Sequence, residues 1–138
     1  MERGASVVSG SAPTARPAAA EGWFFAPVVL RDVPRDARCM KEETFGPLVP
    51  IATFKSDDDA IATANRMDAG LAAYVFTSDA ARGERLVARL TFGHVGLNTA
   101  TGPTPEAPFG GMGDSGYGRE GGIEGILEYT EAQTVPTP

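Results

Sequence analysis

The chain has 138 residues, 42% of them hydrophobic, which suits one globular domain. Its formal net charge of −6 argues against nucleic acid or an anionic membrane as a partner, because polyanion binding needs clustered Lys and Arg. No apolar run approaches the roughly 20 residues that span a bilayer, and the polar start at residues 1–4 does not resemble a signal peptide. The single cysteine excludes an internal disulfide framework, and we expect a cytoplasmic protein.

The first part of the sequence predicts short strands separated by loops. Residues 4–10 include a short apolar stretch, and residues 11–22 are rich in Pro, Ala and Ser, which indicates a loop. Residues 23–30 are apolar and aromatic with one proline, which favours an edge strand. Residues 32–43 form a polar connection, and residues 48–54 form a β-branched, apolar run of strand length.

Helix and strand patterns alternate through the middle of the chain. Residues 56–70 begin with a serine and three aspartates, the pattern of a capped helix start, and end at a glycine. Residues 71–76 predict a strand, residues 78–93 a second capped helix, and residues 94–98 a further strand. This order favours parallel pairing through crossovers, and hence an α/β fold. The apolar stripes of the helices comprise Ala60, Ile61, Ala64 and Met67, then Leu86, Val87 and Leu90.

The last part of the chain begins with a long loop. Residues 99–122 are rich in Gly and Pro, and compact domains rarely tolerate such a loop without a functional reason. The i, i+3, i+4 spacing of Ile123, Ile126 and Leu127 predicts a final short helix. Residues 130–135 alternate weakly, which indicates a terminal strand whose unpaired edge is a template for pairing with another chain.

The sequence predicts a rigid turn at residues 41–47, which read Lys-Glu-Glu-Thr-Phe-Gly-Pro and begin with three charged residues. Gly46 can adopt backbone angles closed to other residues, and Pro47 fixes its own φ and disfavours helix before it. The turn therefore holds the Glu43 carboxylate beside the flat face of Phe45, a pair that suits a sugar diol with an attached ring. An ordinary surface turn between two strands is the alternative interpretation.

A second motif, at residues 108–120, reads Pro-Phe-Gly-Gly-Met-Gly-Asp-Ser-Gly-Tyr-Gly-Arg-Glu. Together with Glu-x-Phe-Gly-Pro at residues 43–47, it resembles the carboxy-terminal part of the NAD(P)-dependent aldehyde dehydrogenase family. The resemblance extends from residue 22 to about 135, and it leans toward the succinate-semialdehyde dehydrogenase group through residues 42–47, 70–74 and 98–99. It implies a partial α/β catalytic domain with a parallel-type sheet and flanking helices, NAD or NADP as cofactor, and a small aldehyde as substrate.

The resemblance also implies how the chain is organised. Residues 1–22 form a short strand and a Pro/Ala-rich loop, residues 23–128 the carboxy-terminal part of the catalytic domain, and residues 129–138 an oligomerisation strand or tail. We expect a homo-oligomer, dimer or tetramer, when the enzyme is complete. The amino-terminal part of the same enzyme is therefore an expected partner.

Cofactor and substrate roles follow from the same resemblance. Glu43 accepts hydrogen bonds from the nicotinamide ribose hydroxyls, and Phe45 packs beside the nicotinamide. Phe109 matches the aromatic that lines the substrate tunnel, with plain core packing as the alternative. The variable substrate-anchor loop corresponds to residues 101–106, which gives three further candidates: Thr101, Pro103 and Thr104. This loop has no Lys or Arg, so its threonines could only assist an arginine supplied from upstream in holding a substrate carboxylate.

No residue of the chain is assigned a catalytic role. In the family a thiolate attacks the aldehyde carbon, and a glutamate later acts as general base in hydrolysis of the thioester. That thiolate sits in Gly-Gln-x-Cys, whereas Cys39 sits in Arg-Cys-Met-Lys. By position, the nucleophile, the base and the nucleotide-binding crossover are expected upstream of Met1. The alternative is a non-catalytic remnant that serves only as an assembly or binding module.

Three other features are interpreted as structural. Residues 116–121 match G-x-G-x-x-G, but the strand before and the acid about 20 positions after are missing, which indicates loop glycines. His94 has no second ligand type at metal-binding spacing, so no metal site is assigned. Gly113 stands where the family commonly has lysine, which leaves the stiffness of this loop open.

Overall fold

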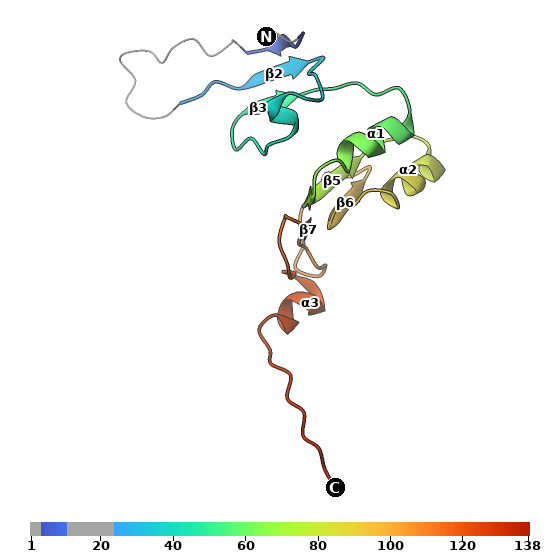
Figure 1. Ribbon diagram of the computed structural model, residues 1–138. Coiled ribbons are helices and arrows are strands. Elements are labelled where there is room, and N and C mark those ends of the chain that lie inside the picture. The colour runs from blue at the N-terminus through green and yellow to red at the C-terminus, as the bar shows by residue number, and fades with distance from the viewer. Residues whose placement is uncertain (1–3, 11–23) are drawn as a thin grey trace. The chain divides into compact units, whose positions relative to one another are not determined.

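The chain forms two compact units, Met1–Lys55 and Ser56–Pro138, in a computed structural model that describes residues 4–10 and 24–138 (Figure 1). The loop predicted at residues 11–22 lies outside the described residues. Within the described ranges, no helix is long and apolar enough to cross a membrane.

The first unit is built on a three-stranded sheet in the order β1-β2-β3. Strand β1 (Ser6–Ser9) pairs antiparallel with β2 (Val28–Arg31), and β2 pairs parallel with β3 (Leu48–Pro50). The prediction of an edge strand at residues 23–30 is therefore wrong, because β2 is the central strand of this sheet. The strand begins after Pro27, so the proline ring does not interrupt its ladder.

The connection between β2 and β3 begins with a backbone hydrogen bond that continues their pairing. Val33 N donates to Ile51 O at 3.1 Å, which extends the pairing beyond β3, and a short 3-10 helix, η1 (Arg38–Met40), follows. Val28 and Val33 are the buried hydrophobic residues of this unit in its described part. The strand predicted over residues 48–54 is shorter than expected, because regular pairing ends at Pro50.

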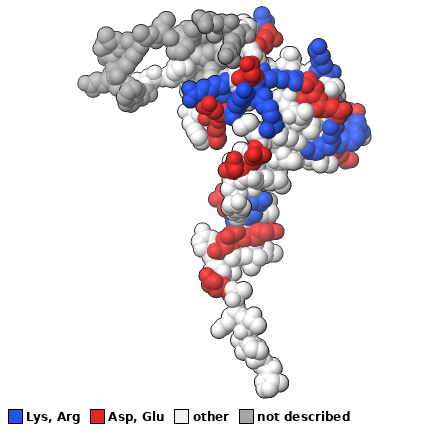
Figure 2. All heavy atoms as spheres, viewed as in Figure 1, with Lys and Arg blue, Asp and Glu red and all other residues white. Residues whose placement is uncertain are grey.

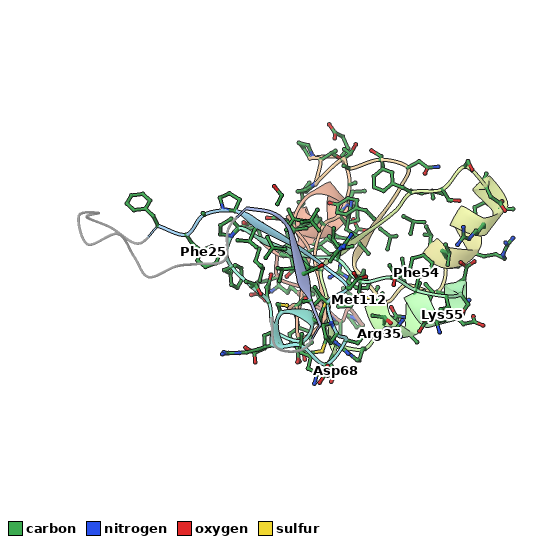
Figure 3. The ribbon with its side chains drawn as sticks, turned by 90° about the horizontal axis from the view of Figure 1, so that it is seen from above. Phe25, Arg35, Phe54, Lys55, Asp68 and Met112 are labelled. Carbon is green, nitrogen blue, oxygen red and sulfur yellow. The ribbon has the colours of Figure 1, made fainter. Side chains whose placement is uncertain are left out.

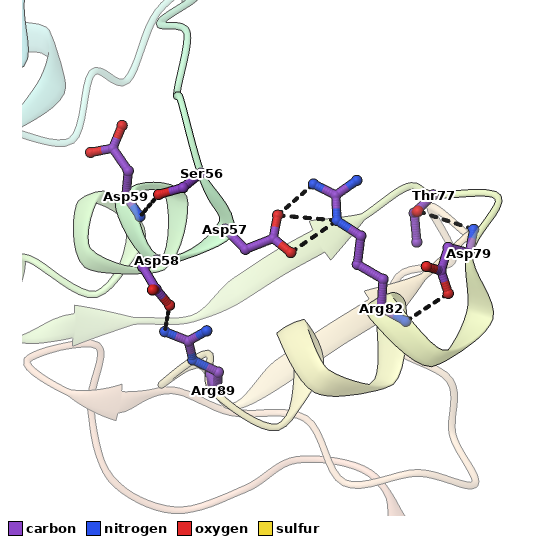
Figure 4. Close-up of polar contacts among 8 residues, drawn as sticks. All are labelled: Ser56, Asp57, Asp58, Asp59, Thr77, Asp79, Arg82 and Arg89. Atoms are coloured by element: carbon purple, nitrogen blue, oxygen red, sulfur yellow. Dashed lines mark hydrogen bonds and ion pairs between the residues drawn. The ribbon is translucent and has the colours of Figure 1, made fainter.

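The second unit contains the predicted helix–strand alternation. Helix α1 (Asp57–Ala64) is followed by β5 (Ala72–Val75), α2 (Ala80–Val87) and β6 (His94–Leu97), and β5 and β6 pair parallel across α2. Both predicted caps are present (Figure 4): the Ser56 hydroxyl accepts from Asp59 N at 3.2 Å, and the Asp79 carboxylate accepts from Arg82 N at 2.9 Å. The α/β prediction is confirmed for this pair.

Both helices end earlier than their apolar patterns predict. Asn65 ends α1, and its side-chain amide donates to Arg89 O at 2.7 Å while its oxygen accepts from Thr91 N at 3.1 Å. This side chain therefore joins the end of α1 to the segment before β6. Met67, predicted on the helix face, lies beyond the helix and is exposed.

The long loop predicted at residues 99–122 contains ordered pairing. Strand β7 (Met112–Gly113) pairs antiparallel with β4 (Ala69–Gly70), and Asp114 N donates to Asp68 O at 2.8 Å. Gly113 has φ +57°, and a Cβ there would collide with Asp68 O. This backbone conformation favours glycine at position 113, and the pairing with β4 holds this part of the loop.

The chain ends in α3 (Gly122–Leu127) and an extended tail (Figure 1). The predicted helix is confirmed, but its apolar residues are uncovered: Ile123 is 73% exposed, Ile126 66% and Leu127 59%. Residues 130–138 form no strand in this chain by itself, and Figure 2 shows this tail almost free of charged side chains. Phe25, Phe54 and Met112, labelled in Figure 3, are also exposed.

Candidate functional site

A hollow of about 210 Å³ lies in the second unit beside β6. We call it the β6 hollow, and it is lined by residues 94–97, Thr99, residues 101–104 and residues 107–109. It brings together all four substrate candidates predicted from the sequence: Thr101, Pro103, Thr104 and Phe109.

Phe109 is held in the wall of the β6 hollow by the backbone. Phe109 N donates to Glu120 O at 2.7 Å and Glu120 N donates to Phe109 O at 2.8 Å, which forms an isolated antiparallel bridge. The half-buried Arg119 side chain donates to Gly111 O at 2.9 Å and to Gly118 O at 2.6 Å, so it closes the loop that follows Phe109. The aromatic ring is thereby placed by four hydrogen bonds to backbone oxygens.

The loop after β6 is folded by its own threonines. The Thr99 and Thr101 hydroxyls are 2.6 Å apart, and Thr101 N donates to the Thr99 hydroxyl at 3.1 Å. Asn98, at φ +53°, turns the chain out of the strand, and its side-chain oxygen accepts from Thr77 N at 2.8 Å. Asparagine tolerates this left-handed conformation better than most residues, which explains its place at the strand end.

His94 contacts both walls of the β6 hollow, a role that the sequence interpretation missed. Its Nε2 lies 3.1 Å from Thr101 O, and its ring centroid lies 5.7 Å from that of Phe109 and 5.9 Å from that of Tyr74. The signal that could have found it is its position at the head of the strand that leads into the candidate loop.

The β6 hollow offers hydroxyls but no fixed charge. No Lys, Arg, Asp or Glu is among the described residues that line it. The Thr104 hydroxyl makes no hydrogen bond within the described part of the chain, whereas the Thr101 hydroxyl is already paired with Thr99. A substrate carboxylate in this hollow would therefore need a cation from another part of the enzyme.

The two cofactor candidates lie in the first unit, on the turn before β3. Gly46 N donates to Thr44 O and Leu48 N donates to Gly46 O, both at 2.8 Å, so two successive three-residue turns shape this segment. Gly46 does not adopt a positive φ, so the glycine freedom expected there is not used. Phe45 is 91% exposed and lines an apolar hollow with Phe24, Phe25, Pro47 and Leu48.

The two carboxylates of this turn differ in their surroundings. Glu42 accepts from Arg38 Nε at 2.7 Å, whereas Glu43 is exposed and makes no hydrogen bond or ion pair with any residue that the structure describes. An unpaired carboxylate two residues from an exposed ring fits a ribose diol and its attached nicotinamide, since each oxygen of a carboxylate can accept a hydroxyl proton. The residues present therefore fit NAD or NADP.

The remaining sequence candidates are structural in this geometry. Cys39 is a half-buried free thiol in η1, between Arg38 and Met40. Gly116, Gly118 and Gly121 all have positive φ and serve turns, rather than a strand-to-helix phosphate loop. The described residues contain no group of three or more His, Cys, Asp or Glu that could hold a metal ion.

Residues 1–135 match the model of the aldehyde dehydrogenase family. The chain belongs to this family. It is 44% identical over 135 residues to the succinate-semialdehyde dehydrogenase of Paenarthrobacter nicotinovorans, and this covers 98% of the chain but 29% of that protein. It is 47% identical over 131 residues to the succinate-semialdehyde dehydrogenase (NADP(+)) GabD of Escherichia coli strain K12, covering 95% of the chain and 26% of that protein. The chain thus spans less than a third of the length of these relatives.

Solved structures of similar proteins have the same fold over this segment. An oxidoreductase from Marinobacter aquaeolei matches with a TM-score of 0.87 and 54% identity, over 99% of this chain and 27% of that one. An aldehyde dehydrogenase of Mycobacterium tuberculosis complexed with NAD+ matches with a TM-score of 0.85 and 37% identity, over 99% of this chain and 28% of that one. The α/β units described above are therefore a partial aldehyde dehydrogenase fold.

Proposed function

We propose that this chain is the carboxy-terminal part of an NAD(P)-dependent aldehyde dehydrogenase. The complete enzyme oxidises a small aldehyde to its carboxylic acid, and succinic semialdehyde is the first candidate substrate. It supplies residues for cofactor ribose binding and for the substrate tunnel, but not the nucleophile. The observation that carries the proposal is the convergence of Thr101, Pro103, Thr104 and Phe109 on one hollow. A remnant kept only for assembly would have no need of such a hollow.

Cofactor binding is proposed for the turn before β3. The free carboxylate of Glu43 accepts hydrogen bonds from the two ribose hydroxyls, and the exposed ring of Phe45 packs against one side of the nicotinamide. When bound, NAD or NADP accepts the hydride of the oxidation. The relatives support both cofactors, since the Escherichia coli enzyme carries NADP(+) in its name and the Mycobacterium tuberculosis structure is a complex with NAD+.

Substrate binding is proposed for the β6 hollow. Phe109 packs against the carbon chain of the aldehyde, and the Thr104 hydroxyl donates to an oxygen at its far end. Pro103 and Thr101 shape the loop around that end. Because the described lining carries no cation, the partner of a substrate carboxylate comes from outside this segment.

The nucleophile is proposed to come from another part of the same enzyme. Cys39 is the only thiol of the chain, and it lies in η1 of the first unit, outside the Gly-Gln-x-Cys pattern. The apolar face of α3 and the tail at residues 130–138, both exposed, are proposed to meet other parts of a cytoplasmic homo-oligomer, with the tail adding a strand to a neighbouring sheet.

A chimera tests this function. In it, the 138 residues replace the matching segment of the Escherichia coli enzyme named above, which is 47% identical to the chain. Because the chimera regains a nucleophile, it should oxidise succinic semialdehyde with NAD or NADP, as followed by absorbance of the reduced cofactor. The 138-residue polypeptide alone should show no turnover.

Two results would contradict the proposal. A chimera that folds and binds cofactor but oxidises no aldehyde would favour the non-catalytic assembly module. Turnover by the polypeptide alone, abolished by Cys39→Ser, would make Cys39 the nucleophile. Circular dichroism and cofactor binding, measured on the chimera, separate an inactive folded protein from an unfolded one.

A further inference from the structure

The geometry points to His94 as a positioning residue that fixes the substrate-anchor loop and the tunnel aromatic relative to each other. This inference rests on the function proposed above, because it concerns the same hollow. His94 is the one titratable residue among the described residues that line the β6 hollow, and neither motif of the sequence includes it.

The hydrogen bond of His94 has a defined direction. Its partner, the Thr101 carbonyl oxygen, can only accept, so His94 Nε2 carries the hydrogen and donates across 3.1 Å. A carbonyl of the anchor loop is thereby tied to the first residue of β6. Thr101 in turn binds Thr99 through its hydroxyl and its amide, so the tie holds the whole turn at the rim of the hollow.

The ring of His94 also contacts the opposite wall. It lies tilted at 58° against Phe109 and edge-on, at 62°, against Tyr74. Aromatic pairs at these centroid distances prefer such tilted or edge-on arrangements. One imidazole therefore bridges two elements that are otherwise fastened separately, Phe109 by Glu120 and the anchor loop by Thr99.

The strand around His94 is rigid enough to support this role. His94 N donates to Leu71 O at 3.0 Å, and Ala72 is its register partner on β5. Two residues along β6, a Cβ on Gly96 would lie 2.7 Å from both the Tyr74 ring and Thr99 O, so these groups close over the strand. The imidazole therefore extends from a paired strand to the rim of the hollow.

Two variants of the chimera separate the hydrogen bond from the ring contacts. His94→Phe keeps a ring against Tyr74 and Phe109 but has no donor, whereas His94→Gln places an amide N–H where Nε2 stands. Loss of one hydrogen bond should raise KM for succinic semialdehyde roughly three- to tenfold in His94→Phe. KM should return to within about twofold of the parent in His94→Gln, with kcat nearly unchanged in both variants.

Asn65→Ala is the matched control. It removes two hydrogen bonds in the same unit, to Arg89 O and from Thr91 N, but Asn65 does not line the β6 hollow. It should lower the melting temperature and leave KM unchanged. A control that raises KM as much as His94→Phe would show that general destabilisation is the cause, and it would overturn the inference.

The outcomes for His94 and for the proposed function are distinct. An unchanged KM in His94→Phe, or an equal rise in both His94 variants, overturns the positioning role while the parent chimera remains active. An inactive but folded parent chimera overturns the proposed function instead. In that case amide exchange in the folded chimera still tests the tie: Thr101 N–H should exchange faster in His94→Phe and at the parent rate in His94→Gln.

Discussion

At the scale of single residues, the two adjacent carboxylates of the turn before β3 have different environments. Glu42 is engaged by Arg38, whereas Glu43 is unpaired within the described ranges. The ion pair engages one oxygen of the Glu42 carboxylate, whereas both oxygens of the Glu43 carboxylate are open within the described ranges. Glu43 can therefore hold a diol with both of its oxygens, and Glu42 serves as its control.

We expect Glu43→Gln in the chimera to slow hydride transfer more than it weakens cofactor binding. The amide offers one acceptor oxygen instead of two, so the ring that receives hydride is placed less accurately. A misplacement of about 1 Å can cost roughly a hundredfold in rate. Single-turnover kinetics measure this step, and cofactor titration measures the binding.

Glu42→Gln is the control for that substitution, since its carboxylate is already paired with Arg38. It should leave the single-turnover rate within about twofold of the parent, because a surface ion pair contributes little. An unchanged rate in Glu43→Gln, or an equal loss in both variants, would remove Glu43 from the cofactor site.

At the scale of elements, α1 and α2 are joined at their amino-terminal ends by an ion pair (Figure 4). Arg82 Nε lies 3.0 Å from both carboxylate oxygens of Asp57, and the side chains are 39% and 34% exposed. The hydrogen bonds and the charge of Arg82 hold the pKa of Asp57 below its usual value of 3.8. Acidic and basic side chains intermingle over these helices (Figure 2).

The direction of this pKa shift predicts how stability depends on pH. A carboxylate whose pKa is lowered on folding contributes stability above its unfolded pKa of 3.8, and the contribution is lost as pH falls through the lower folded pKa. Asp57→Asn in the 138-residue chain should therefore lower the free energy of unfolding at pH 7, with a smaller difference from the parent near pH 3. Urea unfolding at the two pH values measures this.

Asp58→Asn is the matched control for Asp57→Asn. Asp58 also pairs with an arginine of the α2 segment, Arg89 at 2.7 Å, but its side chain is 83% exposed. Exposed pairs contribute little, so this variant should change stability less at pH 7. Equal effects of the two variants, or a larger Asp57→Asn effect in acid, would contradict the assignment.

Elements that depend on interactions between neighbouring residues were predicted correctly from the sequence. The Ser56 and Asp79 caps and the spacing of Ile123, Ile126 and Leu127 located α1, α2 and α3, since caps and periodicity act within a few residues. The central place of β2 and the early end of α1 were not predictable in this way. Both depend on partners distant in sequence, β1 and β3 for β2, and Arg89 and Thr91 for Asn65.

In the candidate site, too, the residues within a motif were predictable from the sequence, whereas a residue placed by long-range contacts was not. The loop residues were found by motif, and the structure places them around one hollow, while their binding roles stay predictions. His94 was missed because its partners, Thr101 O and the rings of Tyr74 and Phe109, meet it only in the folded chain.

At the scale of the whole molecule, large hydrophobic side chains lie mostly on the surface. Among the described residues, Val28, Val33 and Ile61 are the buried hydrophobic core, whereas the apolar face of α3 and the aromatic residues near β2 are exposed. Extensive exposed apolar surface marks contact with another chain or with the rest of the same protein. This exposed apolar surface of the described residues supports the proposal that the chain meets other parts of a larger assembly.

We expect the 138-residue polypeptide to self-associate in solution, because its exposed apolar surface has no other cover. Sedimentation velocity together with amide hydrogen exchange would show association and incomplete protection. A monodisperse, well-protected monomer would contradict this.

In the chimera, deletion of residues 131–138 should weaken subunit association, because it removes the tail proposed to pair with a neighbour.

The far side of the β6 hollow, formed by residues 104–109 and the segment 120–122, is held through backbone atoms. Ala107 N donates to Thr104 O, Gly122 N donates to Pro105 O, and Phe109 is bridged to Glu120 through peptide groups. A change of side chain at Gly102, Pro103 or Thr104 removes none of these bonds, and open space surrounds the position of a Cβ at Gly102. Substitutions at these three positions can therefore change the groups that line the hollow while the hydrogen bonds of its frame stay in place. If the hollow binds the substrate as proposed, aldehyde preference and fold stability can then vary separately in evolution.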